Sequence, residues 1–286
     1  MKIGDYFVVP FIEGTIVRDG GVSFGALPLS EWSRLMTPDD ENGVQFGLRF
    51  FLVQGHGRNV LIDAGIGDKW GDIELRRERI DRTANLDALL NGVGLSPEDI
   101  DIVVATHLHF ASAGGLTRLN DEGVLEPTFP KARVVIQNGE WERAIHTNLR
   151  TRGLYTKEDY EPLLWHQRTE LIEGDYQLLP GLHVRVTGGH TKFHQIVVID
   201  SEGEGAVFWG DLIPSTFHLP LNAISALDLY PLRTMEQKAE WLHRAIDGGW
   251  VSFFSRDPEV AAAQVNGNLK SGDLVCEPLI TDGVRG

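Results

Sequence analysis

The sequence has little cysteine and more acid than base, and both features narrow the classes of protein it can encode. Cys276 is the single cysteine among 286 residues, so an internal disulfide is excluded and a reducing compartment is favoured. Lysine and arginine number 26 against 41 aspartate and glutamate residues, giving a net charge of −15. Because nucleic acids and anionic membranes usually bind basic patches, we expect neither as a partner.

Long hydrophobic runs are also missing. No apolar stretch is long enough to cross a membrane, and the first residues lack the apolar core and cleavage site of a signal peptide. We therefore expect a cytoplasmic protein. Hydrophobic residues make up 42% of the chain, which is ample for a core. We expect residues 1–286 to form a single domain.

Many short apolar runs indicate strands. Residues 45–53 and 59–65 flank a turn-forming segment and predict a hairpin. Helical spacing appears within residues 80–93 and 235–246, and we expect another helix from Glu259 onward. Residues 147–170 predict a helical insertion, which either walls a pocket or is a surface excursion. Strands followed by helices, twice over, favour an α/β protein with two sheets and helices outside them.

A pair of histidines follows one of the clearest strands. The apolar run of residues 102–105 leads to His107 and His109, with Gly114 and Gly115 behind them. Residues two apart on an extended chain point the same way, so both imidazoles can face one point. Two histidines converging in this way are typical of a metal site, although the pair alone is also compatible with packing or surface polarity.

Two later segments strengthen the metal hypothesis. His190 follows the apolar strand that ends near Val186, and Asp211 follows the strand that ends near Trp209. Three histidines and an aspartate at strand ends make a plausible transition-metal site.

Other polar residues near these motifs have less specific interpretations. Asp63 ends a strand, and we favour an Asx turn or a buried hydrogen-bond hub over catalysis. His218 lies in a loop where substrate contact and plain polarity are both open. His194 is expected to support the site or to be exposed rather than to bind metal, and Asp228 to hold its loop by hydrogen bonds.

Together these motifs resemble the metallo-β-lactamase superfamily, and its lactonase-like hydrolases most of all. The resemblance covers most of the chain and rests on segments in the family's order. They are residues 61–65, 106–109, 113–115, 189–191, 210–214 and 253–254 with Asp257-Pro258. It implies a four-layer αβ/βα sandwich with the metal site at the edges of the sheets.

The chain departs from the family pattern at three grouped positions. The family's His-x-His-x-Asp-His motif has Ala111 and Ser112 in its last two places, and Arg256 stands where a histidine precedes Asp257-Pro258. In the family, these three positions bind a second metal. Alanine has no donor atom, serine is a poor zinc ligand and arginine brings positive charge. We therefore expect the second site to be lost, and interpret Ser112 as a small residue filling vacated space.

The resemblance leaves the first metal site intact. The matching ligands are His107, His109 and His190, which suit one zinc ion with an open position. Asp211 matches the aspartate that bridges the two metals in the family. Here it is a fourth ligand, an outer hydrogen-bond acceptor or a partner of Arg256, whose guanidinium can replace the missing cation electrostatically.

A further departure lies beside the third histidine. Phe193 stands where the lactonase-like pattern commonly has glycine, and we expect it to add an apolar wall next to His190. With Ala111, Ser112 and His218 it completes the predicted substrate pocket. The grouped replacements suggest a redesigned or evolved dinuclear hydrolase, a hypothesis that natural relatives sharing them would contradict.

Three functions follow from these expectations. The first is a mononuclear zinc enzyme that hydrolyses a lactone, ester or related bond, with Asp211 and Arg256 as catalytic residues. The second is an engineered zinc Lewis-acid catalyst that acts on a bulky carbonyl substrate without hydrolysis. The third is a metal-free binding protein. We expect a small-molecule substrate and leave a homodimer open.

Overall fold

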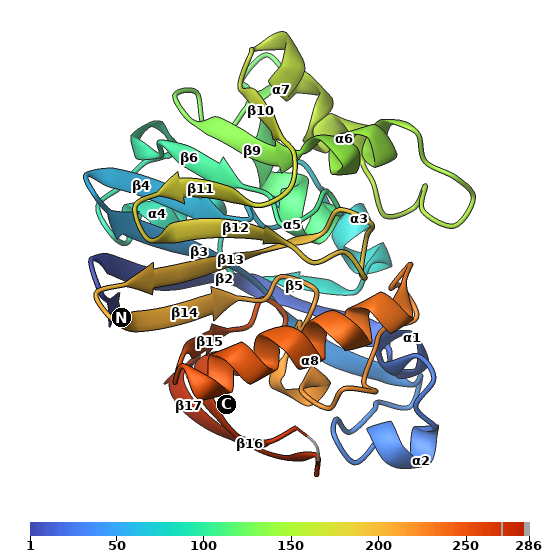
Figure 1. Cartoon of the computed structure of the whole chain (residues 1–286). Helices are drawn as coiled ribbons and strands as arrows, with labels where there is room; N and C mark the ends of the chain where they lie inside the picture. The colour runs from blue at the N-terminus through green and yellow to red at the C-terminus, as the bar shows by residue number, and fades with distance from the viewer. Residues whose placement is uncertain (270, 283–286) are drawn as a thin grey trace.

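Two large β-sheets stacked face to face dominate the computed structural model, which describes residues 1–269 and 271–282 (Figure 1). The first sheet has the order β1-β2-β3-β4-β6-β9-β10, with β5 paired to β2. Its strands are β1 (Lys2–Ile3), β2 (Tyr6–Asp19), β3 (Gly43–Gly55), β4 (Arg58–Ile62), β5 (Ile80–Arg82), β6 (Ile102–Val104), β9 (Arg133–Gln137) and β10 (Thr169–Ile172).

The second sheet runs in chain order from β11 to β17. Its strands are β11 (Tyr176–Leu179), β12 (Leu182–Val186), β13 (Gln195–Ser201), β14 (Glu204–Phe208), β15 (Val251–Phe253), β16 (Val260–Asn268) and β17 (Asp273–Thr281). A separate hairpin joins β7 (Thr117–Leu119) to β8 (Leu125–Pro127). The α-helices are α1 (Gly20–Phe24), α2 (Leu29–Trp32), α3 (Asp72–Arg77), α4 (Leu86–Asn91), α5 (Phe110–Ala113), α6 (Asn138–Ile145), α7 (Glu161–Trp165) and α8 (Pro231–Asp247).

Strand β3 is apolar along most of its length because both of its faces are buried in the core. Phe51 and Val53 point into the space between the two sheets, where they pack with Phe208 and Phe253. Their neighbours Phe50 and Leu52 point to the other face, toward α4 and α6. A strand buried on both faces needs a continuous apolar run. Each such phenylalanine or leucine contributes about 2–3 kcal/mol by leaving water.

The outer face of the second sheet is covered by α8 (Figure 1). Trp241 and Leu242 of this helix pack with Val207 near the end of β14 and with Trp209 just after it. Helix, sheet, sheet and helix therefore form four layers, and the predicted αβ/βα sandwich is confirmed. Within the described residues, no helix is both long enough and apolar enough to span a membrane.

The parallel strands bring the predicted motifs to one edge. Strands β4, β6 and β9 run parallel, so the segments after Ile62 and Val104 leave the sheet together. In the second sheet β14 and β15 are also parallel, which places Asp211 and Arg256 beyond neighbouring strand ends. Parallel strands present their carboxyl ends at the same edge, where sites usually form.

The prediction of a C-terminal helix from Glu259 onward is wrong. Residues 260–268 form β16, which pairs with β15 and β17. The run Ala261-Ala262-Ala263 is fully buried, with Ala262 packed between the two sheets and Ala263 packed with the residues under α8. Alanine is the strongest helix former, but helix propensity is a weak determinant and tertiary pairing overrides it here.

The segment expected as a helical insertion is only partly helical. It holds the 3₁₀ turn Lys157–Asp159 and the short helix α7. A buried ion pair, 3.0 Å between Lys69 Nζ and Asp159 Oδ1, ties it to the body of the chain. The single domain expected over residues 1–286 stays a prediction, and residues 270 and 283–286 of that range lie outside the described part.

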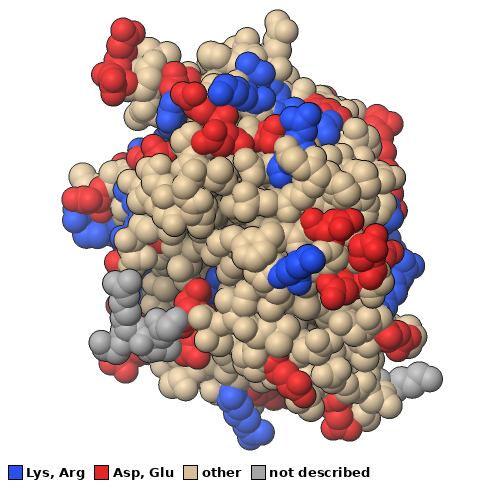
Figure 2. Space-filling model, turned by 90° about the vertical axis from the view of Figure 1, so that its left-hand side faces the viewer, with Lys and Arg blue, Asp and Glu red and all other residues tan. Residues whose placement is uncertain are grey.

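Charged groups on the surface are mixed in sign. On the face shown in Figure 2, several lysine and arginine side chains near the top lie beside acidic ones, and the others are scattered among uncharged residues. A nucleic-acid surface would gather basic groups along one stripe. This face does not present one.

Candidate metal centre

Three buried histidines meet at the sheet edge. His107 follows β6, His109 precedes α5 and His190 lies in the loop between β12 and β13. His109 Nδ1 is 3.0 Å from His190 Nε2, and the candidate ligand atoms of all three lie within 4.8 Å of one another. The expected convergence of the His-x-His pair with His190 is therefore present.

The donor set fits a small transition-metal ion. Asp211 Oδ2 lies 3.6 Å from Nε2 of both His107 and His190. Ligand atoms on a tetrahedral zinc ion are separated by about 3.3 Å, because each bond is about 2.0–2.1 Å long. In the described part of the chain, His107 Nε2 is buried without a hydrogen-bond partner, which is costly unless something else binds it.

Burial also favours the uncharged form of two of these histidines. It lowers the pKa of His107 and His109 well below the usual value, and neighbouring histidines lower both further. Burial lowers the pKa of His190 too, but the hydrogen bond and charge of Asp228 outweigh it and raise that pKa overall. Neutral imidazoles are the form that binds a metal.

Asp228 fixes the orientation of His190. Its Oδ1 is 2.8 Å from His190 Nδ1, and its Oδ2 accepts a 2.6 Å hydrogen bond from Thr234 of α8. Because His190 donates its Nδ1–H to Asp228, its Nε2 carries a lone pair, which points toward His109. The expectation that Asp228 holds its loop by hydrogen bonds was correct but missed this contact.

Replacing Asp228 by asparagine should weaken zinc binding. The amide keeps the size of the side chain but removes the charge that orients the imidazole and increases its basicity. We expect the zinc dissociation constant to rise about 10- to 100-fold, as when other outer partners of zinc histidines are removed. Competition with a zinc-binding dye measures it, with Asp200→Asn on the exposed end of β13 as the matched control. An unchanged constant in a folded Asp228→Asn protein would contradict the assigned role.

A second relay orients His107. Thr106 Oγ1 is 2.9 Å from His107 Nδ1 and donates to the buried carboxylate of Asp63. Because the Thr106 hydroxyl hydrogen is given to Asp63, Nδ1–H of His107 donates to the Thr106 oxygen. The lone pair of His107 Nε2 is then free to bind a metal. Asp63 also accepts from the backbone of Thr106 at 2.8 Å, so its preferred interpretation as a hydrogen-bond hub is confirmed. Burial raises the pKa of Asp63 to about 7, against the opposing effect of these hydrogen bonds.

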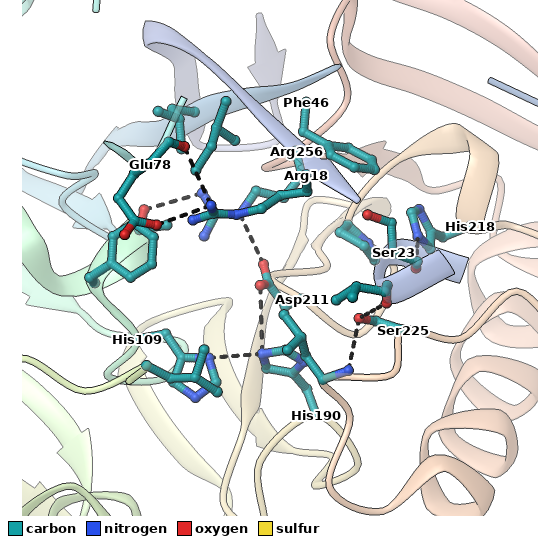
Figure 3. Close-up of a pocket in the computed structure, with 18 of the residues that line it drawn as sticks. Arg18, Ser23, Phe46, Glu78, His109, His190, Asp211, His218, Ser225 and Arg256 are labelled. Atoms are coloured by element: carbon teal, nitrogen blue, oxygen red, sulfur yellow. Dashed lines mark hydrogen bonds and ion pairs between the residues drawn. The ribbon is translucent and has the colours of Figure 1, made fainter. Parts of the chain in front are cut away.

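Arg256 contacts both Asp211 and the segment that carries the unusual residues Ala111 and Ser112. Its Nε donates to Asp211 Oδ1 at 3.2 Å, its Nη1 to the carbonyl of Ala111 at 3.1 Å and its Nη2 to Ser112 Oγ at 2.7 Å. Asp211 thus lies between Arg256 and His190 (Figure 3). Burial alone would raise the pKa of Asp211, but Arg256 and the histidines lower it to about 2.

These contacts open onto a cavity of about 330 Å³. The polar side chains of His109, His190, Asp211 and Arg256 line it together with Ala111. Leu154 of the inserted segment also lines it, so that segment does wall a pocket. A cavity of this size suits a small organic molecule.

The comparisons with known proteins agree with this geometry. Residues 49–255, well over half of the chain, match the Metallo-beta-lactamase superfamily. The chain belongs to this superfamily.

Relatives within the superfamily include lactonases. N-acyl homoserine lactonase AiiA of Bacillus thuringiensis subsp. kurstaki is 33% identical over 137 residues, 48% of this chain and 46% of the relative. The chain thus spans about half the length of the curated relatives it matches. A probable metal-dependent hydrolase from Staphylococcus aureus has a TM-score of 0.86 and 31% identity, covering 92% of this chain and 94% of that one.

More distant structures share the superfamily fold. AidC, described as a dizinc quorum-quenching lactonase, has a TM-score of 0.80 at 18% identity and covers 98% of this chain and 96% of its own. At a sequence identity this low, the similarity shows a shared fold and nothing about function. The two sheets and their outer helices are therefore common to proteins whose sequences have largely diverged.

Phe193 does not lie where the superfamily resemblance led us to expect. Its ring packs against Gly139 at the start of α6, and it is absent from the cavity wall. A Cβ at Gly139 would stand 2.3 Å from the ring, so glycine is what lets the phenyl group fit there. The predicted apolar wall beside His190 is thus a packing contact behind the loop.

The remaining predicted residues divide between wall and support. Ala111 and His218 line the cavity, whereas Ser112 is fully buried beneath Arg256. His218 contacts Ser215 Oγ at 2.7 Å and stacks on Phe24, so it also stabilises the wall.

Two further residues support the superfamily site: His194, for which support was one of the two expected alternatives, and Glu140, which sequence reasoning missed. His194 Nε2 accepts a 3.1 Å hydrogen bond from the backbone of Asp211. Glu140 accepts from Thr191 at 2.6 Å and from Tyr155 at 2.9 Å, which joins α6, the inserted segment and the loop of His190. The only sequence feature that pointed to a role for His194 was its nearness to His190. No sequence feature pointed to Glu140.

Proposed function

We propose that the chain is a hydrolase with one zinc ion, held by His107, His109 and His190, and that it opens a lactone or ester. The observation that carries this proposal is the position of Arg256, whose three hydrogen bonds place a guanidinium among the residues that match second-metal ligands. The curated relatives named as N-acyl homoserine lactonases support the bond type. When bound, zinc supplies Lewis acidity that polarises a carbonyl and activates water near neutral pH.

Asp211 is suited to hold the attacking water. Its low pKa keeps it ionised at neutral pH, so both oxygens accept hydrogen bonds. Oδ1 is occupied by Arg256, while Oδ2 faces the histidines and the cavity. A water that donates to Oδ2 is oriented toward a carbonyl lying in the cavity.

Arg256 is suited to stabilise negative charge in the transition state. Its side chain lines the cavity, and each Nη atom carries a second hydrogen beyond those given to Ala111 and Ser112. Because the guanidinium is held by three contacts, its charge needs little reorganisation during the reaction. The guanidinium supplies the positive charge that a second metal ion would bring, but it cannot coordinate a ligand as a metal does.

The alternative of a Lewis-acid catalyst without hydrolysis loses much of its basis. It relied on volume vacated by Ala111 and Ser112 and on Phe193 packing against a bulky substrate. Arg256 reaches both positions, and Phe193 packs on Gly139. The metal-free alternative leaves the buried His107 Nε2 without a hydrogen-bond partner among the described residues.

Zinc-dependent ester and lactone cleavage tests the proposal. We expect 4-nitrophenyl esters and neutral lactones to yield free acids with zinc-loaded protein, and the rates to vanish after chelation and return with one equivalent of zinc. Carbonyl-addition products without hydrolysis would favour the Lewis-acid function instead. Rates that persist without zinc would reject both.

A further inference from the structure

A second arginine enters the same cavity as Arg256. Arg18 comes from the end of β2, far from Arg256 in sequence, yet both line the cavity. Figure 3 shows the two side chains above Asp211, with Glu78 on the other side of Arg18. Burial lowers the pKa of Arg18, and the nearby charge of Arg256 lowers it further. Each of the two arginines needs a counter-charge in this largely apolar cavity, and Glu78 and Asp211 supply these before any metal binds.

The guanidinium of Arg18 is only partly used by the protein. Its Nη1 donates to Glu78 Oε2 at 3.1 Å and to the Glu78 carbonyl at 3.4 Å. Within residues 1–269 and 271–282, neither Nε nor Nη2 of Arg18 makes a hydrogen bond. The side chain is 30% exposed, and its guanidinium carbon lies 5.5 Å from the ring centre of Phe110. Donors therefore remain for a ligand beside a flat aromatic surface.

The charge balance of the cavity also favours an anion. Arg18 and Arg256 face the carboxylates of Glu78 and Asp211, so the cavity is neutral before any metal binds. Glu78 is further shared with Arg77, whose Nε lies 3.5 Å from its Oε1. A divalent ion on the three histidines then makes the cavity positive. A neutral substrate would leave that charge unbalanced.

The rest of the wall is mostly apolar, although Ser23, His218 and Ser225 also line it. Its apolar part is formed by side chains from β2, β3, α5 and two loops: Ile16, Phe46, Leu48, Phe110, Leu154 and Leu227. Such a wall accepts a hydrocarbon or aromatic body but offers it few hydrogen bonds. Polar recognition is concentrated at the two arginines and the histidine cluster.

We propose that the substrate joins an apolar body to an anionic group such as a carboxylate, and that Arg18 binds this group. The inference rests on the proposed function, because it takes this cavity as the substrate site. It distinguishes among the substrates of that function, since it favours acidic esters or lactones over neutral ones. Arg18 is then a specificity residue, separate from the zinc ligands.

Two probes that differ only in charge test the inference. Octanesulfonate and octyl methyl sulfone share an apolar chain, but only the first is anionic, and neither is a good zinc ligand. We expect calorimetry to show the sulfonate binding about tenfold more tightly or better, as charge-assisted hydrogen bonds allow. The measurement is made with zinc-loaded and with chelator-treated protein, so that it does not depend on hydrolysis.

Variants of opposite effect isolate Arg18. We expect Arg18→Met to abolish the preference for the sulfonate and Arg18→Lys to keep part of it. Glu78→Gln removes the competing carboxylate and should strengthen sulfonate binding several-fold. Arg244→Met is the matched control, because Arg244 lies on the exposed side of α8 and pairs with Glu240. Thermal melting checks that each variant is folded.

The outcomes separate this inference from the proposed function. Equal affinity for both probes, no binding of either, or a preference unchanged in Arg18→Met would overturn it. A preference lost in Arg256→Met but kept in Arg18→Met would also overturn the assignment to Arg18. Failure of the proposed function appears instead as zinc-independent or absent hydrolysis, whatever the probes do.

Discussion

Protein saturated with zinc and freed of excess metal should hold one zinc ion per chain, and the His107→Ala variant almost none. His107, His109 and His190 surround one point, and Nε2 of His107 has no hydrogen-bond partner among the described residues. Alanine removes a direct ligand, so we expect a larger loss than the about 10- to 100-fold that follows removal of an outer partner. Hydrolysis should fall with the metal content. Elemental analysis measures the zinc.

The matched control replaces a histidine away from the site. His243 of α8 is 71% exposed in its side chain and pairs with Asp247, so His243→Ala should keep its zinc. Two zinc ions in the parent chain would mean that Ala111, Ser112 and Arg256 leave the second site functional. No zinc in the parent chain would favour the metal-free binding protein.

The fold was accessible to sequence reasoning because its signals are local. The apolar run of β3, the turn after it and the histidines beyond β6 each lie within a few residues of one another. The order of the motifs then indicated how the strands are arranged. The helix expected from Glu259 failed for the opposite reason. Its small residues are set by contacts with β15 and β17, which no local pattern records.

The part of the site that could be predicted from the sequence is the part whose chemistry depends directly on residue type. Alanine, serine and arginine at the three altered positions predicted a guanidinium in place of a metal, and Arg256 does contact both Ala111 and Ser112. Arg18 gave no such signal, because its importance depends on β2 passing beside the cavity. Phe193 was misplaced because its direction depends on the space left by Gly139.

Placing the family's metal ligands at positions 111, 112 and 256 together should create a second metal site. Ala111→Asp and Ser112→His supply an oxygen and a nitrogen donor, and Arg256→His removes the guanidinium while adding a third ligand. Asp211 is then freed from its 3.2 Å contact with Arg256 and can face two cations. We expect the zinc content of the triple variant to rise from one to two per chain. Elemental analysis after removal of excess zinc gives the count.

The single variant Arg256→Met is the control that separates charge from ligands. It removes the guanidinium but leaves Ala111 and Ser112, which cannot hold a metal, so the count should stay at one. Its hydrolytic rate should fall, because Asp211 keeps its negative charge and no cation compensates the charge developing on the substrate. The triple variant should regain rate, since a second zinc supplies that charge again. If Arg256→Met alone took up a second zinc, the residues at 111 and 112 would not be what excludes it. If the triple variant stayed at one, the resemblance that assigned these positions to metal ligands would not hold for this chain.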